Sequence, residues 1–362
     1  MLLAGPVAIA FFSGGYFAGP RAWAGLAAWL LVVVAGLAAS GPPARSRVAW
    51  LALIGLSALA AWTLISYRWS PIEGTAYDDG QRVFLYAGTL IAAAWLLRDR
   101  VLALLEPAVA AGTVIVIGYG LSERLAPWLL SFQGSPAAQG RLEQPLTYWN
   151  AMGAMAALGI VLCAHLAGER ERPDWMRIVA AAAAGLLGLG LYSTFSRGAM
   201  FACVAGLVAL VVMRPTRPGL RGISIAVAAA LLGALAGAPF SGVTSLSGSH
   251  HTRVVQGTVV LALLIVITLA AAAAVALVLA RERDGRLSDA PVGLPRHAGP
   301  LALALVVVAF GVFLLVGDKE SNGARLSGGA ARLTTLQSNR YAYWKVAWRA
   351  FEAEPLHGVG GG

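Results

Sequence analysis

Long apolar runs alternate with short polar segments along almost the whole chain. A run of roughly 20 apolar residues is long enough to cross a bilayer as a helix. Apolar and polar residues do not alternate with the two-residue period of a barrel strand, so the pattern predicts helices. We expect about eleven membrane-spanning helices, at residues 2–19, 22–40, 48–66, 83–97, 101–121, 150–167, 178–194, 198–213, 222–240, 256–280 and 300–317.

Arginines are distributed unequally between the two sets of alternate loops. One set holds fourteen: Arg45, Arg47, Arg98, Arg100, Arg170, Arg172, Arg177, Arg214, Arg217, Arg221, Arg281, Arg283, Arg286 and Arg296. The opposite set holds seven: Arg21, Arg68, Arg82, Arg124, Arg141, Arg197 and Arg253. The positive-inside rule assigns the richer set to the cytoplasm and the N-terminus to the same side. We therefore expect a transmembrane domain at 1–317 and the beginning of an outer segment at 318–362.

The composition agrees with a polytopic all-α membrane protein. Hydrophobic residues make up 58% of the chain and charged residues 12%, about half the charged fraction of a soluble domain. The net charge of +10 follows from topology-setting arginines, so we do not expect nucleic-acid binding. Cys163 and Cys203 lie inside apolar spans, and no Asp, Glu or His cluster has the spacing of metal ligands. No metal or cofactor is expected.

Ser196-Arg197-Gly198 separates two expected spans by only about three residues. An arginine at the end of a span often extends its side chain to the interface without further function. The short turn, however, holds Arg197 close to the membrane, and an ionisable group at that depth is a candidate for a functional site.

A second polar segment runs from Gly140-Arg141 to Tyr148-Trp149-Asn150 and enters the span at 150–167. Asn150 is a residue type that caps helices, and the two aromatic residues are typical of a membrane interface. Arg141 is predicted to share the outer face with Arg197, which adds a functional interpretation to the structural one.

The last polar segment begins at Arg340. Residues 340, 344 and 348 share one face of a helix, which is compatible with an amphipathic helix on the outer surface. Gly358 and Gly360, which follow Pro355, predict a helix stop and a backbone that approaches another part of the protein closely. The alternative is that this segment lines a polar site.

The predicted outer face thus carries three arginines, Arg141, Arg197 and Arg340. Guanidinium groups bind phosphate oxygens through paired hydrogen bonds and keep their charge. They could therefore neutralise a leaving pyrophosphate in place of a divalent cation. Histidine suits a general base, and the outer-face histidines His250, His251 and His357 are weak candidates.

Four segments together resemble the O-antigen ligase and O-antigen polymerase superfamily of bacterial polysaccharide membrane enzymes. They are Arg68-Trp69-Ser70-Pro71, Gly140-Arg141-Leu142 with Pro145 and Asn150, Ser196-Arg197-Gly198, and Arg340 with Trp344, Pro355 and Gly358-Val359-Gly360. The resemblance covers almost the whole chain, and its last two segments are the most specific.

The resemblance implies a GT-C-like helical bundle of the bacterial cytoplasmic membrane that works without a metal. It would move a glycan from a polyprenyl-pyrophosphate carrier to a hydroxyl on a glycan, lipid or protein acceptor, by ligation or polymerisation. Arg197 and Arg340 would bind the pyrophosphate with Arg141 as a third contact, supported by Ser196, Asn150, Trp344, Gly358 and Gly360. A twelfth span and the family's catalytic histidine would lie beyond Gly362, so we expect a C-terminally truncated, inactive fragment.

The alternative function is a transporter or flippase for a lipid-linked or anionic solute. Such proteins usually have internal repeats, broken helices and ionisable groups near the bilayer midplane. The chain has no evident repeat, and its charges gather at the predicted outer boundary, which favours the enzyme.

Overall fold

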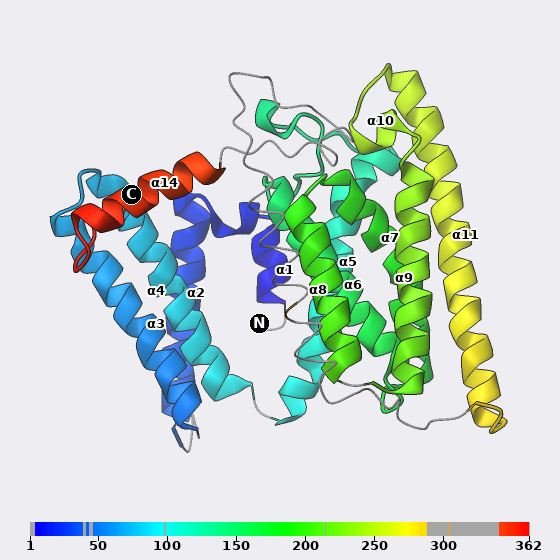
Figure 1. Ribbon diagram of the computed structural model, residues 1–362, viewed down its shortest axis with the longest axis horizontal. Helices are drawn as coiled ribbons and strands as arrows, with labels where there is room; N and C mark the ends of the chain where they lie inside the picture. Colours follow the sequence, from blue (N-terminus) through cyan, green and yellow to red (C-terminus); the bar gives the residue numbers. More distant parts are fainter. Residues whose placement is uncertain are drawn as a thin grey trace. The chain divides into compact units, whose positions relative to one another are not determined.

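The computed structural model describes residues 4–38, 41–42, 46–97, 99–213, 215–287, 304 and 340–361. These residues form helices joined by turns and loops, without a strand among them (Figure 1). Seven of the described helices are long and apolar enough to cross a membrane. This confirms an all-helical protein of the multi-pass membrane class, whereas the total of eleven spans and the GT-C-like arrangement stay predictions. The expected span at 300–317, except residue 304, the boundary at 317 and segment 318–339 lie outside the described residues.

The first compact unit, unit 1, comprises Met1–Leu105 and Ser338–Gly362. Its helices are α1 (Gly5–Ala10), α2 (Ala18–Ala38), α3 (Arg47–Ile65), α4 (Glu73–Leu96), the start of α5 (Asp99–Leu125) and α14 (Arg340–Ala353). Helix α4 packs against both α2 and α3. Trp29 of α2 stacks on Phe84 of α4, with the ring centroids 4.4 Å apart. Unit 1 is therefore organised around α4.

The first expected span, at residues 2–19, is wrong. Helix α1 has only six residues, and α2 begins at Ala18. Between them Ser13, Gly14 and Gly15 have positive φ angles of 55°, 65° and 74°. Three successive residues in the left-handed region cannot continue a right-handed helix, so the apolar run is interrupted although its composition is suitable for a span.

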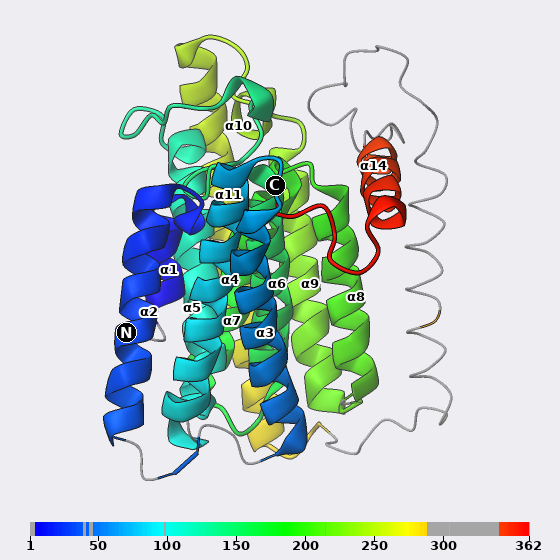
Figure 2. The ribbon, with the colours of Figure 1, turned by 90° about the vertical axis from the view of Figure 1, so that its left-hand side faces the viewer.

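The second compact unit, unit 2, comprises Glu106–Gln337. It contains the rest of α5 and helices α6 (Trp149–Gly168), α7 (Asp174–Ser193), α8 (Arg197–Met213), α9 (Arg217–Gly237), α10 (Ser241–Thr244) and α11 (His250–Arg283). Helix α7 packs against α6, α9 and α11, and α6 also packs against α8 and α9. Figures 1 and 2 show these helices running side by side. Helices α6 and α7 are the most enclosed candidate spans, so the core of unit 2 lies around them.

Glycines allow α7 and α9 to pack backbone against backbone. A Cβ atom on Gly188 of α7 would collide with the carbonyl oxygen of Ala230, and one on Gly233 of α9 with that of Gly185. Close approach through small residues is the usual way in which helices associate in lipid, where water does not drive them together. The α7–α9 contact therefore depends on these glycines rather than on large apolar side chains.

We expect Gly233→Ala to lower the free energy of unfolding by about 1–3 kcal/mol, because the two backbones must separate to admit a methyl group. The same change in an open helix position favours the helix, since alanine has the higher helix propensity. Gly55 of α3 is the matched control, because no atom lies within 4 Å of the place that a Cβ would take there. Detergent unfolding of both variants measures the difference, and equal stability would contradict the role of the glycines.

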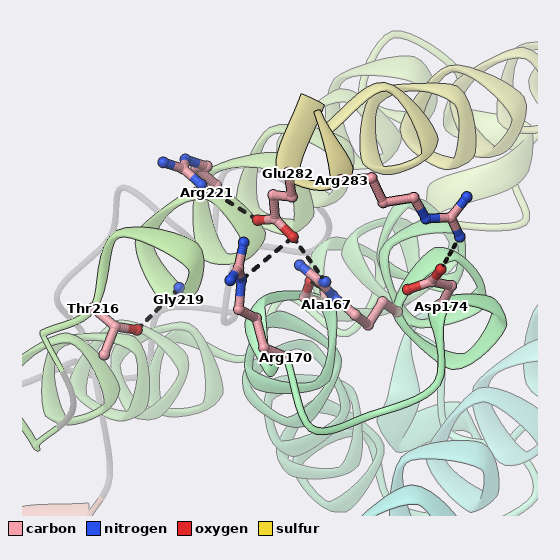
Figure 3. Close-up of polar contacts among 9 residues, drawn as sticks. Ala167, Arg170, Asp174, Thr216, Gly219, Arg221, Glu282 and Arg283 are labelled. Atoms are coloured by element: carbon pink, nitrogen blue, oxygen red, sulfur yellow. Dashed lines mark hydrogen bonds and ion pairs between the residues drawn. The ribbon is translucent and has the colours of Figure 1, made fainter. Parts of the chain in front are cut away.

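One end of unit 2 carries a network of ion pairs, here called the arginine-rich end. Glu282, in the last turn of α11, lies within 4 Å of Arg170, Arg177 and Arg221 (Figure 3). Glu106 of α5 contacts His165 and Arg172 at the same end. The loops that the arginine count assigned to one side thus lie at one end of unit 2. The side of a membrane that this end faces stays a prediction.

Candidate functional site

The opposite end of unit 2, the loop end, holds the residues that the sequence singled out in this unit. It is formed by the 126–148 loop, the 194–196 turn and the 238–249 segment with α10. The amide of Leu142 donates to the carbonyl of Ser193 at 2.9 Å and ties the long loop to the end of α7. The loop end is therefore a packed structure in which several chain segments meet.

Arg124, in the last turn of α5, holds these segments together. Its side chain is buried, and its guanidinium donates to the carbonyls of Val243 at 2.7 Å, Thr244 at 2.9 Å and Gly140 at 2.7 Å. A single planar donor group thus joins α10 to the long loop, a geometry suited to arginine and not to lysine. From the sequence alone, Arg124 stands out only as a topology signal.

We expect Arg124→Met to lower the free energy of unfolding by about 2–3 kcal/mol, because buried carbonyls lose their donor while the apolar volume is kept. Arg68→Ala is the control, since Arg68 also ends a candidate span but is exposed. An exposed substitution of this kind changes stability by about 0.5 kcal/mol or less. Detergent unfolding compares the two, and a loss no larger for Arg124 would show that the loop end is held by other contacts.

Two carboxylates shape the interior of the same loop. Glu123 accepts from the amide of Phe132 at 3.0 Å, and Glu143 accepts from the hydroxyl of Ser135 at 2.7 Å. Both side chains are buried, and together with Arg124 and Gln144 they line a cavity of about 30 Å³. This is room for one or two water molecules, so these groups organise the loop.

Arg141 is also built into the loop. Its guanidinium donates to the carbonyls of Ala137 at 2.6 Å and Ala138 at 2.7 Å. The guanidinium carbon lies 3.6 Å from the centroid of the Trp149 ring, a cation–π contact. The side chain is 5% exposed. The structure thus gives Arg141 a positioning role, and its expected contact with pyrophosphate stays a prediction.

Asn150 and Ser196, two of the expected supporting residues, meet at the loop end. The Ser196 hydroxyl donates to Asn150 Oδ1 at 2.9 Å, and Asn150 Nδ2 donates to the Tyr148 hydroxyl at 2.7 Å. Asn150 lies inside α6, whose N-cap position is occupied by Tyr148, so it does not cap that helix. It instead joins the start of α6 to the start of α8.

Arg197 is the first residue of α8 and is partly exposed. Two positions before it, Phe195 has a positive φ of 46°. The Ser196 hydroxyl oxygen accepts from the amide of Ala199 at 3.4 Å. Nothing lies within 4 Å of the Cβ position at Gly198. A helix N-terminus with a guanidinium beside it is well suited to an anion.

The other expected residues are distributed over both units. His250 and His251 are exposed at the start of α11 in unit 2. Trp344, His357, Gly358 and Gly360 belong to unit 1, as does Arg340, the first residue of α14. The meeting of Arg340 with Arg197 at one pyrophosphate therefore stays a prediction.

The glycine-rich end does approach another segment closely, as the sequence indicated. Gly360 has a φ of 92°, and a Cβ there would lie 2.6 Å from Ser70 Cα. The Ser70 hydroxyl donates to the carbonyl of Gly361 at 2.7 Å, and the amide of Gly361 donates to Ser66 Oγ at 3.2 Å. This segment packs on the turn between α3 and α4, within unit 1.

Comparison with known proteins does not identify a relative. No family model matches the chain. No curated protein matches it, and neither does any solved structure.

Proposed function

We propose that the protein is a glycosyltransferase of the O-antigen ligase type, acting at the outer face of the bacterial cytoplasmic membrane. It would move a glycan from a polyprenyl-pyrophosphate carrier to a hydroxyl of a glycan, lipid or protein acceptor. The observation that carries the proposal is the start of α8. There Arg197 directly follows Ser196, whose hydroxyl donates to Asn150. The next residue, Gly198, lies beside open space.

The chemistry of the proposed step needs a group that stabilises a leaving pyrophosphate. The acceptor oxygen forms a bond to the anomeric carbon while the bond from that carbon to the pyrophosphate oxygen breaks. Negative charge grows on the leaving oxygen, and a fixed guanidinium with helix amides stabilises it without reorganisation. Arg197 is proposed for this role, with Arg340 as the second guanidinium.

The acceptor proton must pass to a base as the new bond forms. The resemblance to the superfamily assigns this role to a histidine, and His250, His251 and His357 are weak candidates for it in this chain. Ligation and polymerisation share the same bond changes and differ only in the acceptor. The proposal therefore concerns the transfer step common to both.

The experiment uses the full-length gene product in proteoliposomes with a polyprenyl-pyrophosphate-linked oligosaccharide and a set of hydroxyl acceptors. Transfer is measured as release of free polyprenyl pyrophosphate together with a glycosylated acceptor. Neither product would appear if the protein were the alternative, a transporter or flippase. In that case the donor would change leaflets intact, which a membrane-impermeant lectin detects on the same vesicles.

A further inference from the structure

Helix α14 exposes an unusual density of aromatic side chains. All described side chains from Ala342 to Arg349 are exposed, and Tyr343, Trp344 and Trp348 are 69%, 49% and 61% exposed. Phe351 follows at 53%. A contiguous apolar surface of this kind on a protein marks a region that contacts something other than water.

The helix has two distinct faces. Trp344, Trp348 and Phe351 follow the spacing i, i+4, i+7 and share one face. The charged residues Lys345, Arg349 and Glu352 follow the same spacing one position later and therefore share a neighbouring face. The Trp348 indole nitrogen donates to Glu352 Oε1 at 2.7 Å, so its polar edge is directed to the charged face. Aromatic residues beside basic ones are typical of helices that lie in a membrane interface.

The chain after α14 fixes this helix near the end of a membrane span. The His357 ring centroid lies 5.9 Å from that of Trp69, and Trp69 directly follows the candidate span Arg47–Arg68. His357 is only four positions beyond Ala353, the last residue of α14, a reach of at most about 14 Å. The C-terminal end of α14 is thus connected to the end of that span by a short segment.

The direction of α14 is that of an interfacial helix. In Figure 1 it runs across the axes of α2, α3 and α4, and in Figure 2 it is seen nearly end-on while those helices remain upright. All four helices belong to unit 1. A helix that runs across spanning helices lies along the membrane surface instead of through it.

We propose that α14 binds the lipid interface of the membrane that the chain itself spans. Trp344, Trp348 and Phe351 enter the boundary between headgroups and acyl chains, and Lys345 and Arg349 face the phosphate layer. Arg340, at the start of this helix, is also the proposed second guanidinium for pyrophosphate. The interfacial role of Trp348 and Phe351 does not depend on glycan transfer and would exist in a transporter as well.

The test places an environment-sensitive fluorophore on each face of α14. Cys163 and Cys203, both buried, are first replaced with alanine in the full-length chain. Trp348→Cys and Arg349→Cys are then labelled with a nitrobenzoxadiazole probe in vesicles of phosphatidylcholine and phosphatidylglycerol. Brominated acyl chains should quench the label at 348 at least about twofold more than the label at 349, and aqueous iodide should show the reverse order.

A second pair of cysteine variants is needed because the first pair removes Trp348, one of the proposed membrane contacts. Phe351→Cys and Glu352→Cys repeat the comparison with every tryptophan retained, and circular dichroism confirms the helix content of each labelled protein. Equal iodide quenching on both faces would place α14 in water and overturn the proposal. A label at 348 and 351 that neither quencher reaches would mean that protein covers the aromatic face, which also overturns it.

Discussion

Replacing Glu282 with alanine is expected to lower the free energy of unfolding by about 3–5 kcal/mol, the usual cost of removing one partner from a buried ion pair. The Glu282 side chain is 6% exposed and accepts from Arg177 Nη1 at 3.0 Å and Arg221 Nη1 at 3.3 Å. Arg170 Nε lies 3.6 Å away. The Arg177 side chain is only 4% exposed, so the variant would leave a buried cation without its carboxylate.

The effect should spread beyond one pair, because Glu282 joins segments that are far apart in the sequence. Its three arginines come from the α6–α7 turn, from α7 and from α9, as Figure 3 shows around the carboxylate. Arg177 also donates to the carbonyl of Ala167 at the end of α6 at 3.2 Å. Through this side chain the last turn of α11 is therefore joined to three other segments of unit 2.

Asp174→Ala is the matched control for Glu282→Ala. Asp174 pairs with Arg283 and links the same two helices, α7 and α11, at the same end (Figure 3). The side chains of Asp174 and Arg283 are 41% and 72% exposed, and exposed pairs contribute at most about 1 kcal/mol. Unfolding in mixed micelles measures both variants. Equal losses would show that burial does not decide the strength of these pairs.

Helices were predictable from the sequence because apolar runs are a local signal. The structure confirms helices at most of the expected spans, including Trp149–Gly168 and Asp174–Ser193. The first span failed because backbone geometry at Ser13, Gly14 and Gly15 overrides composition. Hydropathy reflects the preference of side chains for water or lipid and carries no information on the backbone angle φ.

Ion pairs were not predictable, since each depends on which residues the tertiary fold brings together. Glu106, for example, contacts His165 and Arg172, which lie more than fifty positions away in the sequence. Arg170, Arg172, Arg177 and Arg221 gather at one end of unit 2, as their shared loop set predicts. That prediction was possible because the positive-inside rule acts on the number of arginines and not on their partners. Nothing in the sequence around Glu282 indicated that it forms ion pairs with three arginines.

The candidate site was predictable in part. The spacing around Pro355 and Gly360 indicated a close backbone approach, and the contact with Ser70 confirms it. The short turn at Ser196 indicated a fixed Arg197, but not the bond from Ser196 to Asn150 that joins α6 to α8. Arg124 was missed because a buried and an exposed arginine at a helix end look alike in sequence.

Replacing Arg197 with alanine is expected to reduce glycan transfer by about 10²–10³-fold if the proposed function holds, the range found when one stabilising donor is removed from a developing anion. The turnover number should fall more than the apparent affinity for donor, because charge on the leaving pyrophosphate grows in the transition state. Arg197→Lys retains charge but loses the paired donors, so it should recover only part of the activity. Transfer assays on the full-length protein measure both.

Arg253→Ala tests whether general loss of positive charge at the loop end explains such a result. Arg253 lies in the first turn of α11 in the same unit and has no assigned part in binding pyrophosphate. If both alanine variants lost activity equally, the arginines would act through the overall electrostatic potential. A loss confined to Arg197, with a stability equal to that of the parent protein, would assign the effect to the start of α8, the proposed site for pyrophosphate.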